Sequence, residues 1–253
     1  MTRAIRSELL KLRTARLPWG LLGVAVALTS VHSVLFDSNA GGTGHTAIKS
    51  LATSSGQSQA LGVPREVLLF AAALGVIVAS GEFRHRTATS TYLAIPDRVR
   101  VLGAKAVAAA STGLLFGLAC AAVTTGIGLS FITTGGHHVV LSAATITRYA
   151  AGATVGAALL AAAGVGLGSL VRSQVGAVIA VFVWGLVVEQ TLSGVYDSAQ
   201  RFLPFTMAAS LAGTRLEAGT TPLPFAVAAA LVATLAAAIS LIAARTTLNA
   251  DIT

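Results

Sequence analysis

The sequence predicts an all-α integral membrane protein with six transmembrane helices, and three observations support this fold class. First, 55% of the 253 residues are hydrophobic and only 10% are charged, whereas ordinary soluble domains carry about 25% charged residues. Second, the apolar residues form runs close to the roughly 20 residues that a helix needs to cross a bilayer. Third, these runs lack the apolar–polar alternation of a transmembrane β-barrel. Lipid is therefore the expected solvent for much of the surface.

Six apolar runs are the predicted spans of a single transmembrane domain that covers residues 1–253. The second run is imperfect because Arg65 and Glu66 lie in its first turns, and the fifth is clean only as far as Val188. Three residues separate the fourth run from the fifth, which is enough for a tight hairpin only. The predicted spans are residues 17–36, 61–81, 106–131, 149–171, 175–192 and 223–244.

The placement of the cationic residues predicts the orientation. The chain has 17 Lys and Arg against 9 Asp and Glu, a net charge of +8, which in a soluble protein would suggest nucleic acid as a partner. With six spans, twelve of the cations fall on one side and only Lys49, Arg65, Arg148, Arg201 and Arg215 on the other. Because positive residues accumulate in cytoplasmic loops, we expect both termini in the cytoplasm and no nucleic-acid partner.

Residues 1–16 are predicted to form an interfacial helix. Ile5, Leu9 and Leu12 share one narrow arc at 3.6 residues per turn. Arg3, Arg6 and Arg13 lie away from this arc and can meet anionic headgroups. Two alternatives stay open: a solvated basic tail that only sets topology, and a secretory signal peptide. The apolar run 17–36 is longer than the usual hydrophobic region of a signal peptide, and no clear small-x-small cleavage site follows it. The residues assigned to the interfacial helix are Arg6, Glu8, Leu9, Lys11 and Arg13.

Two external segments differ in composition. Residues 39–60 are rich in Gly, Ser and Thr with almost no charge, so we interpret them as a flexible linker. In residues 193–221, the apolar stretch 202–213 is too short to span. It is expected to form a short re-entrant or interfacial piece that packs on the bundle before the last helix.

The loop between the second and third spans, residues 82–105, is the most informative cytoplasmic segment. It mixes charges of both signs with aromatic and aliphatic residues, and apolar anchors within a charged rim suit a docking surface for a soluble protein. Pro96 is expected to stop one short helix, and Asp97 to lie near the start of the next. A topogenic basic loop without a partner is the alternative.

Three motifs, in this order, give the chain a resemblance to a known family. They are residues 7–16 before the first span, residues 81–89 followed by Pro96 and the basic run 98–105, and the hairpin 171–177. With the six-span count and the segment near Leu203-Pro204-Phe205, the sequence resembles the permease subunit of bacterial type-2 ATP-binding-cassette exporters over nearly its whole length. The charged start of the second span departs from the pattern and leaves that span's outer boundary open.

The resemblance implies a mechanism and partners. Two permease chains, here as a homodimer in the bacterial plasma membrane, would form a twelve-helix efflux pathway, and each would dock on a cytoplasmic ATPase subunit that carries the ATP and Mg²⁺. The loop after the second span would contain a coupling helix, and the N-terminal helix would lie along the inner membrane surface. The residues that this resemblance assigns to ATPase coupling are Gly81, Glu82, Phe83, Arg84, Arg86, Thr87, Asp97 and Arg98.

The sequence contains no motif for chemistry of its own. It has no Gly-x4-Gly-Lys-Ser/Thr phosphate loop, no His-Glu-x-x-His and no Gly-x-Ser-x-Gly elbow. We therefore expect no catalytic residues, no bound cofactor and no metal in this chain, and a membrane enzyme is the least favoured function. A non-transporting membrane scaffold or sensor component of an ATP-binding-cassette complex is the alternative to a transporter. The few polar groups in the spans weakly favour a hydrophobic or amphipathic substrate.

Glu189 is the candidate pathway residue. An ionisable group near the end of a span is a functional candidate by default, so Glu189 could line the exit or pair with Arg201 or Arg148. The simpler interpretation is that it marks the water interface. For Arg65 and Glu66 the first expectation is snorkelling or a local pair.

Overall fold

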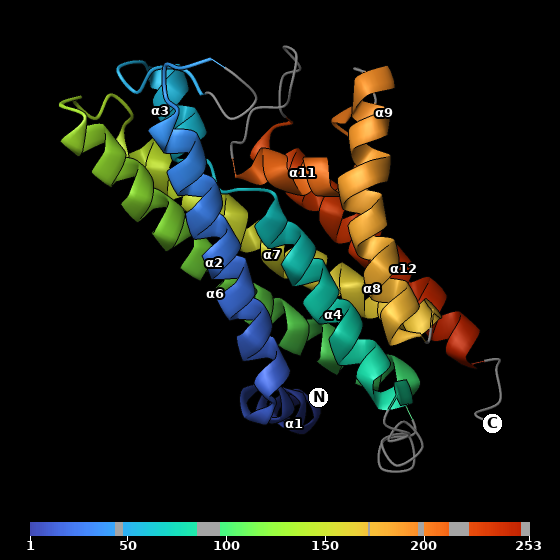
Figure 1. Cartoon of the computed structure of the whole chain (residues 1–253). Coiled ribbons are helices and arrows are strands. Elements are labelled where there is room, and N and C mark those ends of the chain that lie inside the picture. Colours follow the sequence, from blue (N-terminus) through green and yellow to red (C-terminus); the bar gives the residue numbers. More distant parts are fainter. Residues whose placement is uncertain (44–47, 85–96, 172, 197–199, 213–222, 249–253) are drawn as a thin grey trace.

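The computed structural model describes residues 1–43, 48–84, 97–171, 173–196, 200–212 and 223–248. Across these residues the chain is helical and contains no strand, which confirms the all-α class (Figure 1). The helices are α1 (Thr2–Thr14), α2 (Arg16–Ser38), α3 (Ser54–Ala60), α4 (Glu66–Arg84), α6 (Arg98–Thr134), α7 (Ala143–Val171), α8 (Gln174–Val183), the π-helix η1 (Trp184–Val188), α9 (Glu189–Val195), α11 (Pro204–Leu211) and α12 (Phe225–Leu248).

Five helices within the described ranges are long and apolar enough to cross a membrane, which indicates a multi-pass membrane protein. They are Arg16–Ser38, Val99–Thr134, Ala143–Val171, Gln174–Val195 and Phe225–Thr246. In Figure 1, α1 and the end of α12 lie at the same end of the bundle, and α3 lies at the opposite end.

The second predicted span is the one that falls short of this criterion. It begins at Glu66 and not at Leu61, and its apolar part ends at Gly81. Pro64 accounts for the late start, because the residue before a proline is disfavoured in helical conformation. Glu66 therefore begins α4, and Arg65 lies in the turn directly before it. At 1.5 Å per residue the 19 residues of α4 extend about 28 Å.

Two helices are longer than predicted. The long helix α6 starts at Arg98, so residues 98–105 are its first two turns and not part of a loop. Asp97 caps it as expected, since the Asp97 carboxylate accepts a hydrogen bond from the Arg100 amide at 3.0 Å. Helix α7 starts six residues before the predicted span, at Ala143, and the hairpin to α8 is as tight as predicted, with the Ser173 hydroxyl capping α8.

Helix α7 lies at the centre of the bundle, in contact with α4, α6, α11 and α12. Small residues allow these close contacts. The pair Gly113 and Gly117 of α6 faces the backbone of α7, and Gly164 and Gly168 of α7 face the backbone of α4. The small-residue spacing therefore serves packing within one chain, because short side chains let helix backbones approach.

The segment predicted to be a flexible linker, residues 39–60, contains a folded cap over the end of the bundle. Ile48 and Leu51 are buried, α3 covers the end of α6, and Gln57 is fully buried. The Gln57 amide donates to the carbonyl oxygens of Leu51 (3.0 Å) and His138 (2.7 Å), and its oxygen accepts from the amides of Val140 (2.8 Å) and Leu141 (3.3 Å). Composition alone did not predict this cap. Its Gly, Ser and Thr content is typical of a flexible linker, but the side chain of Gln57 satisfies four backbone groups and holds the segment in place.

Replacing Gln57 with leucine should loosen this cap. Four backbone groups would lose their partner, and a buried unsatisfied polar group costs about 1–3 kcal/mol. We expect a lower Tm in detergent and rapid proteolysis in the segments 48–53 and 137–142. Gln59→Leu is the matched control, because Gln59 is exposed and its side chain accepts one hydrogen bond, from the Lys49 amide, among the residues that the structure describes. Equal protease resistance of the two variants would contradict the role given to Gln57.

Candidate functional site

Glu189 lies at a junction of three elements and is fully buried. One carboxylate oxygen, Oε1, accepts from the indole Nε1 of Trp184 at 3.1 Å and from the amide of Phe205 at 2.9 Å. The other, Oε2, accepts from the amide and hydroxyl of Thr206, each at 3.2 Å, and forms an ion pair with the guanidinium group of Arg65. The carboxylate thus joins α9, α11 and the turn directly before α4.

Local sequence explains why a carboxylate lies here. Helix α11 starts with Pro204, which has no amide hydrogen, and the next two amides point at Glu189. The N-terminus of a helix carries unpaired N–H groups and a partial positive charge, so Glu189 caps α11 from another helix. The π-helical turn Trp184–Val188 comes directly before Glu189; such turns recur at functional sites.

This geometry corrects the expectations for three charged residues. Glu189 does not mark a water interface, and its partner is Arg65, not Arg201 or Arg148. Arg65 and Glu66 do not serve mainly as a pair for each other, because Glu66 lies 3.3 Å from the Nδ1 atom of His32 on α2. The position of Glu189 next to an apolar run indicated that it needs a cation partner. Sequence spacing could not identify this partner as Arg65, because the two residues are 124 positions apart.

A row of polar side chains runs along the buried face of α2. Thr29, Ser33 and Asp37 are four residues apart and at most 3% exposed, and Thr124 of α6 is equally buried. The Oγ atom of Ser33, Oδ2 of Asp37 and Oγ1 of Thr124 have no hydrogen-bond partner within the described chain. At its end Asp37 lines a cavity of about 350 Å³ shared with Phe131, Thr134 and His137. We call Thr29, Ser33, Asp37 and Thr124 together the α2 polar row.

A second buried ion pair lies at the opposite end of the bundle. The Glu8 carboxylate of α1 is 3.0 Å from the Lys105 ammonium group of α6 and 2.6 Å from that of Lys11. The side chains of Glu8 and Lys105 are 7% and 5% exposed. In Figure 1, α1 lies at a steep angle to α2, below the ends of the long helices. The ion pair thus fixes α1 to the second turn of α6.

The described part of the chain includes only some of the predicted coupling residues. Gly81 and the backbone of residues 82–84 form the last turn of α4, and Asp97 and Arg98 form the start of α6. Arg86 and Thr87 lie outside the described residues, as do Pro96 and the expected short helix before it. Of the interfacial-helix residues, Glu8 is buried and Leu9 half-buried, while Arg6, Lys11 and Arg13 are exposed. Sequence spacing gave no sign that Glu8 and Lys105 would meet.

The described residues contain no group of three or more His, Cys, Asp or Glu side chains that could hold a metal ion. No known protein-family model matches the chain, and no curated protein matches it.

Proposed function

We propose that this chain is the membrane-spanning permease subunit of an ATP-driven exporter of the ATP-binding-cassette type, which works with a separate cytoplasmic ATPase subunit. The observation that carries the proposal is the Glu8–Lys105 ion pair. It attaches the amphipathic helix α1 to the base of α6, the helix that directly follows the predicted coupling segment. Movement of that segment by an ATPase would reach α1 and α6 together.

Two further features support transport over a passive scaffold. Ionisable and hydroxyl side chains at membrane depth are costly, and they commonly mark pathways. The α2 polar row and the Glu189–Arg65 pair place such groups on the inner faces of α2, α6 and α9. In this proposal ATP binding closes the two ATPase subunits, and their differential binding to two states of the bundle drives alternating access. Two copies of the chain would pair, six spans each, with the termini in the cytoplasm.

Purification of the tagged chain from its native membranes tests the assembly. We expect a protein with a Gly-x4-Gly-Lys-Ser/Thr loop to co-purify, and replacement of both Glu82 and Arg84 to weaken that association. Reconstitution of the complex in vesicles then separates an exporter from a scaffold or sensor, since only an exporter moves substrate when ATP is added. The proposal fails if no ATPase associates, or if the Glu82 and Arg84 replacements change neither assembly nor transport.

Lys105→Met tests the α1–α6 connection itself. The ammonium group is lost while Lys11 still neutralises Glu8, so we expect the complex to assemble but the substrate-stimulated ATPase rate to fall by about tenfold, the size of a typical coupling energy. Lys49→Met is the control, because Lys49 is exposed at the other end of the bundle. Normal stimulation in a stable Lys105→Met complex would contradict a coupling role for this pair.

A further inference from the structure

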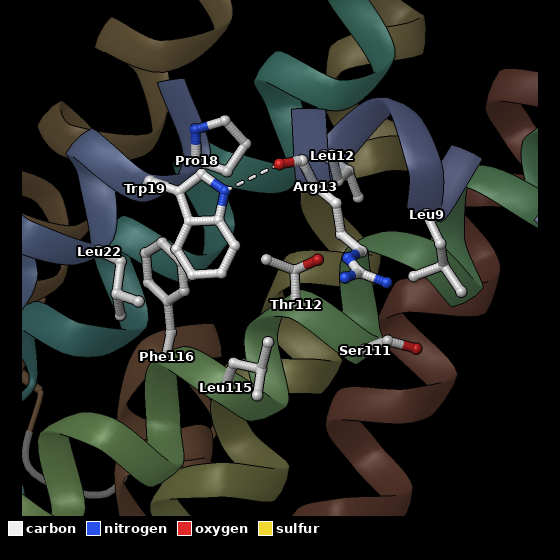
Figure 2. Close-up of a pocket in the computed structure, with 10 residues that line it drawn as sticks. All are labelled: Leu9, Leu12, Arg13, Pro18, Trp19, Leu22, Ser111, Thr112, Leu115 and Phe116. Carbon is white, nitrogen blue, oxygen red and sulfur yellow. Dashed lines mark hydrogen bonds between the residues drawn. The ribbon is translucent and has the colours of Figure 1, made fainter. Parts of the chain in front are cut away.

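A cavity of about 210 Å³ lies between α1, the first turns of α2, and α6 (Figure 2). Four leucines and a phenylalanine are half of its ten lining residues, and Trp19 closes one side. The Trp19 indole is held in place because its Nε1 donates to the backbone oxygen of Arg13 at 3.2 Å. The residues that line the cavity are Leu9, Leu12, Arg13, Pro18, Trp19, Leu22, Ser111, Thr112, Leu115 and Phe116.

Arg13 is the one charged side chain on this cavity. Figure 2 shows its guanidinium group reaching from α1 toward Ser111 and Thr112 of α6. No carboxylate of the described residues pairs with it. The hydroxyl groups of Ser111 and Thr112 donate to backbone oxygens of their own helix, those of Val107 and Ala108. The cavity therefore combines an apolar floor with one cation at its edge that has no carboxylate partner among the described residues.

We propose that this cavity binds one anionic phospholipid, with an acyl chain on the apolar floor and the phosphate on Arg13. Charge complementarity selects this occupant, because a planar guanidinium group binds phosphate through paired charge-assisted hydrogen bonds. The position of the cavity along the membrane normal also suits a lipid headgroup. The cavity lies at the start of the membrane helix α2, and tryptophans such as Trp19 concentrate at the level of the headgroups. Arg3, Arg6 and Arg16 are exposed nearby in sequence and attract anionic lipid to this surface.

The bound lipid contacts the same elements that the Glu8–Lys105 ion pair connects. Its acyl chain touches α1, α2 and α6 at once, so occupancy stabilises the position of α1 on the bundle. This inference needs α1 to lie at a membrane surface but needs no ATPase partner. The result of its test is therefore independent of whether the chain is part of an exporter.

Trp19 provides a direct probe of the cavity. The chain has two tryptophans, so Trp184→Phe leaves Trp19 as the only indole. This variant is placed in phosphatidylcholine nanodiscs containing increasing fractions of bromine-labelled phosphatidylglycerol, or of bromine-labelled phosphatidylcholine. We expect saturable quenching by the labelled phosphatidylglycerol, with half-saturation at a fraction about tenfold lower than for the labelled phosphatidylcholine, as one charge-assisted contact predicts.

Three variants locate the site. Arg13→Gln should raise the half-saturating fraction of labelled phosphatidylglycerol about tenfold, whereas Arg3→Gln, on the same helix but outside the cavity, should change it little. Ser111→Phe should fill the cavity and lower the maximal quenching by both lipids. Inorganic phosphate alone should not displace the quenching lipid, since it cannot occupy the apolar floor.

Several results would overturn the proposal. Equal quenching by the two lipids, or equal effects of Arg13→Gln and Arg3→Gln, would mean that only bulk annular lipid is present. No quenching by either lipid would mean that a protein segment covers the cavity, and displacement by inorganic phosphate would remove the need for an acyl chain. Native mass spectrometry of the unmodified chain is the second measurement: it should retain one phosphatidylglycerol, which Arg13→Gln loses and Arg3→Gln keeps.

Discussion

Replacing Glu189 with alanine is expected to destabilise the protein by about 3–5 kcal/mol, the usual cost of breaking a buried ion pair from one side. The Arg65 guanidinium group would lose its counter-ion, and the amides of Phe205 and Thr206 would lose their acceptor. Because those amides begin α11, this helix should detach first from α7. Thermal unfolding in detergent, followed by size-exclusion chromatography, measures the loss.

Two further variants separate the capping contribution from the charge. Glu189→Gln keeps an oxygen that can accept from the α11 amides but leaves Arg65 unpaired. Combining it with Arg65→Met removes the unpaired cation, so the double variant should be more stable than Glu189→Gln alone and far more stable than Glu189→Ala. If all three variants unfold at the temperature of the unmodified protein, Glu189 does not hold this junction together.

The sequence predicted the parts of the fold that depend on local pattern. Apolar run length located five of the helices to within a few residues at most ends, and Asp97 was recognisable as a helix start because a short acidic side chain before a helical pattern satisfies the first amides. The tight hairpin before Gln174 followed from spacing alone. These features are determined by residues close to one another along the chain.

The candidate site could be predicted only in part, because its contacts join residues far apart in sequence. Glu189 was a candidate by its chemistry, but Arg65 is its partner only because α4 packs against α8 and α11, which brings the turn before α4 to Glu189. The sequence placed Glu8 on an interfacial helix and Lys105 in the basic run of a cytoplasmic loop, and both are buried because α1 lies on α6. Gln57 shows the same limit, since its hydrogen bonds connect two loops that have no shared pattern.

A close backbone approach between the central helices α4 and α7 gives the second large expected effect. A side-chain carbon at Gly164 would overlap the carbonyl oxygen of Ala72, and one at Gly75 would overlap that of Ala161. Added atoms in a packed interior cost about 1–3 kcal/mol and occasionally more. Here the backbone itself blocks them, and no rotamer change relieves the overlap. Gly164→Val should therefore separate the two central helices and lower the yield of folded protein severely.

Gly126 of α6 is the matched control for this effect. A side-chain carbon there meets nothing within 4 Å, although both glycines lie in long apolar helices, so only local packing distinguishes them. Alanine ordinarily favours a helix over glycine by about 0.5–1 kcal/mol. Gly126→Ala should therefore be neutral or slightly stabilising, while Gly164→Ala should lower the Tm. The measurement is the change in Tm, which should have opposite signs for the two glycine-to-alanine substitutions. If both substitutions shift the Tm in the same direction, α4 and α7 are not packed backbone to backbone.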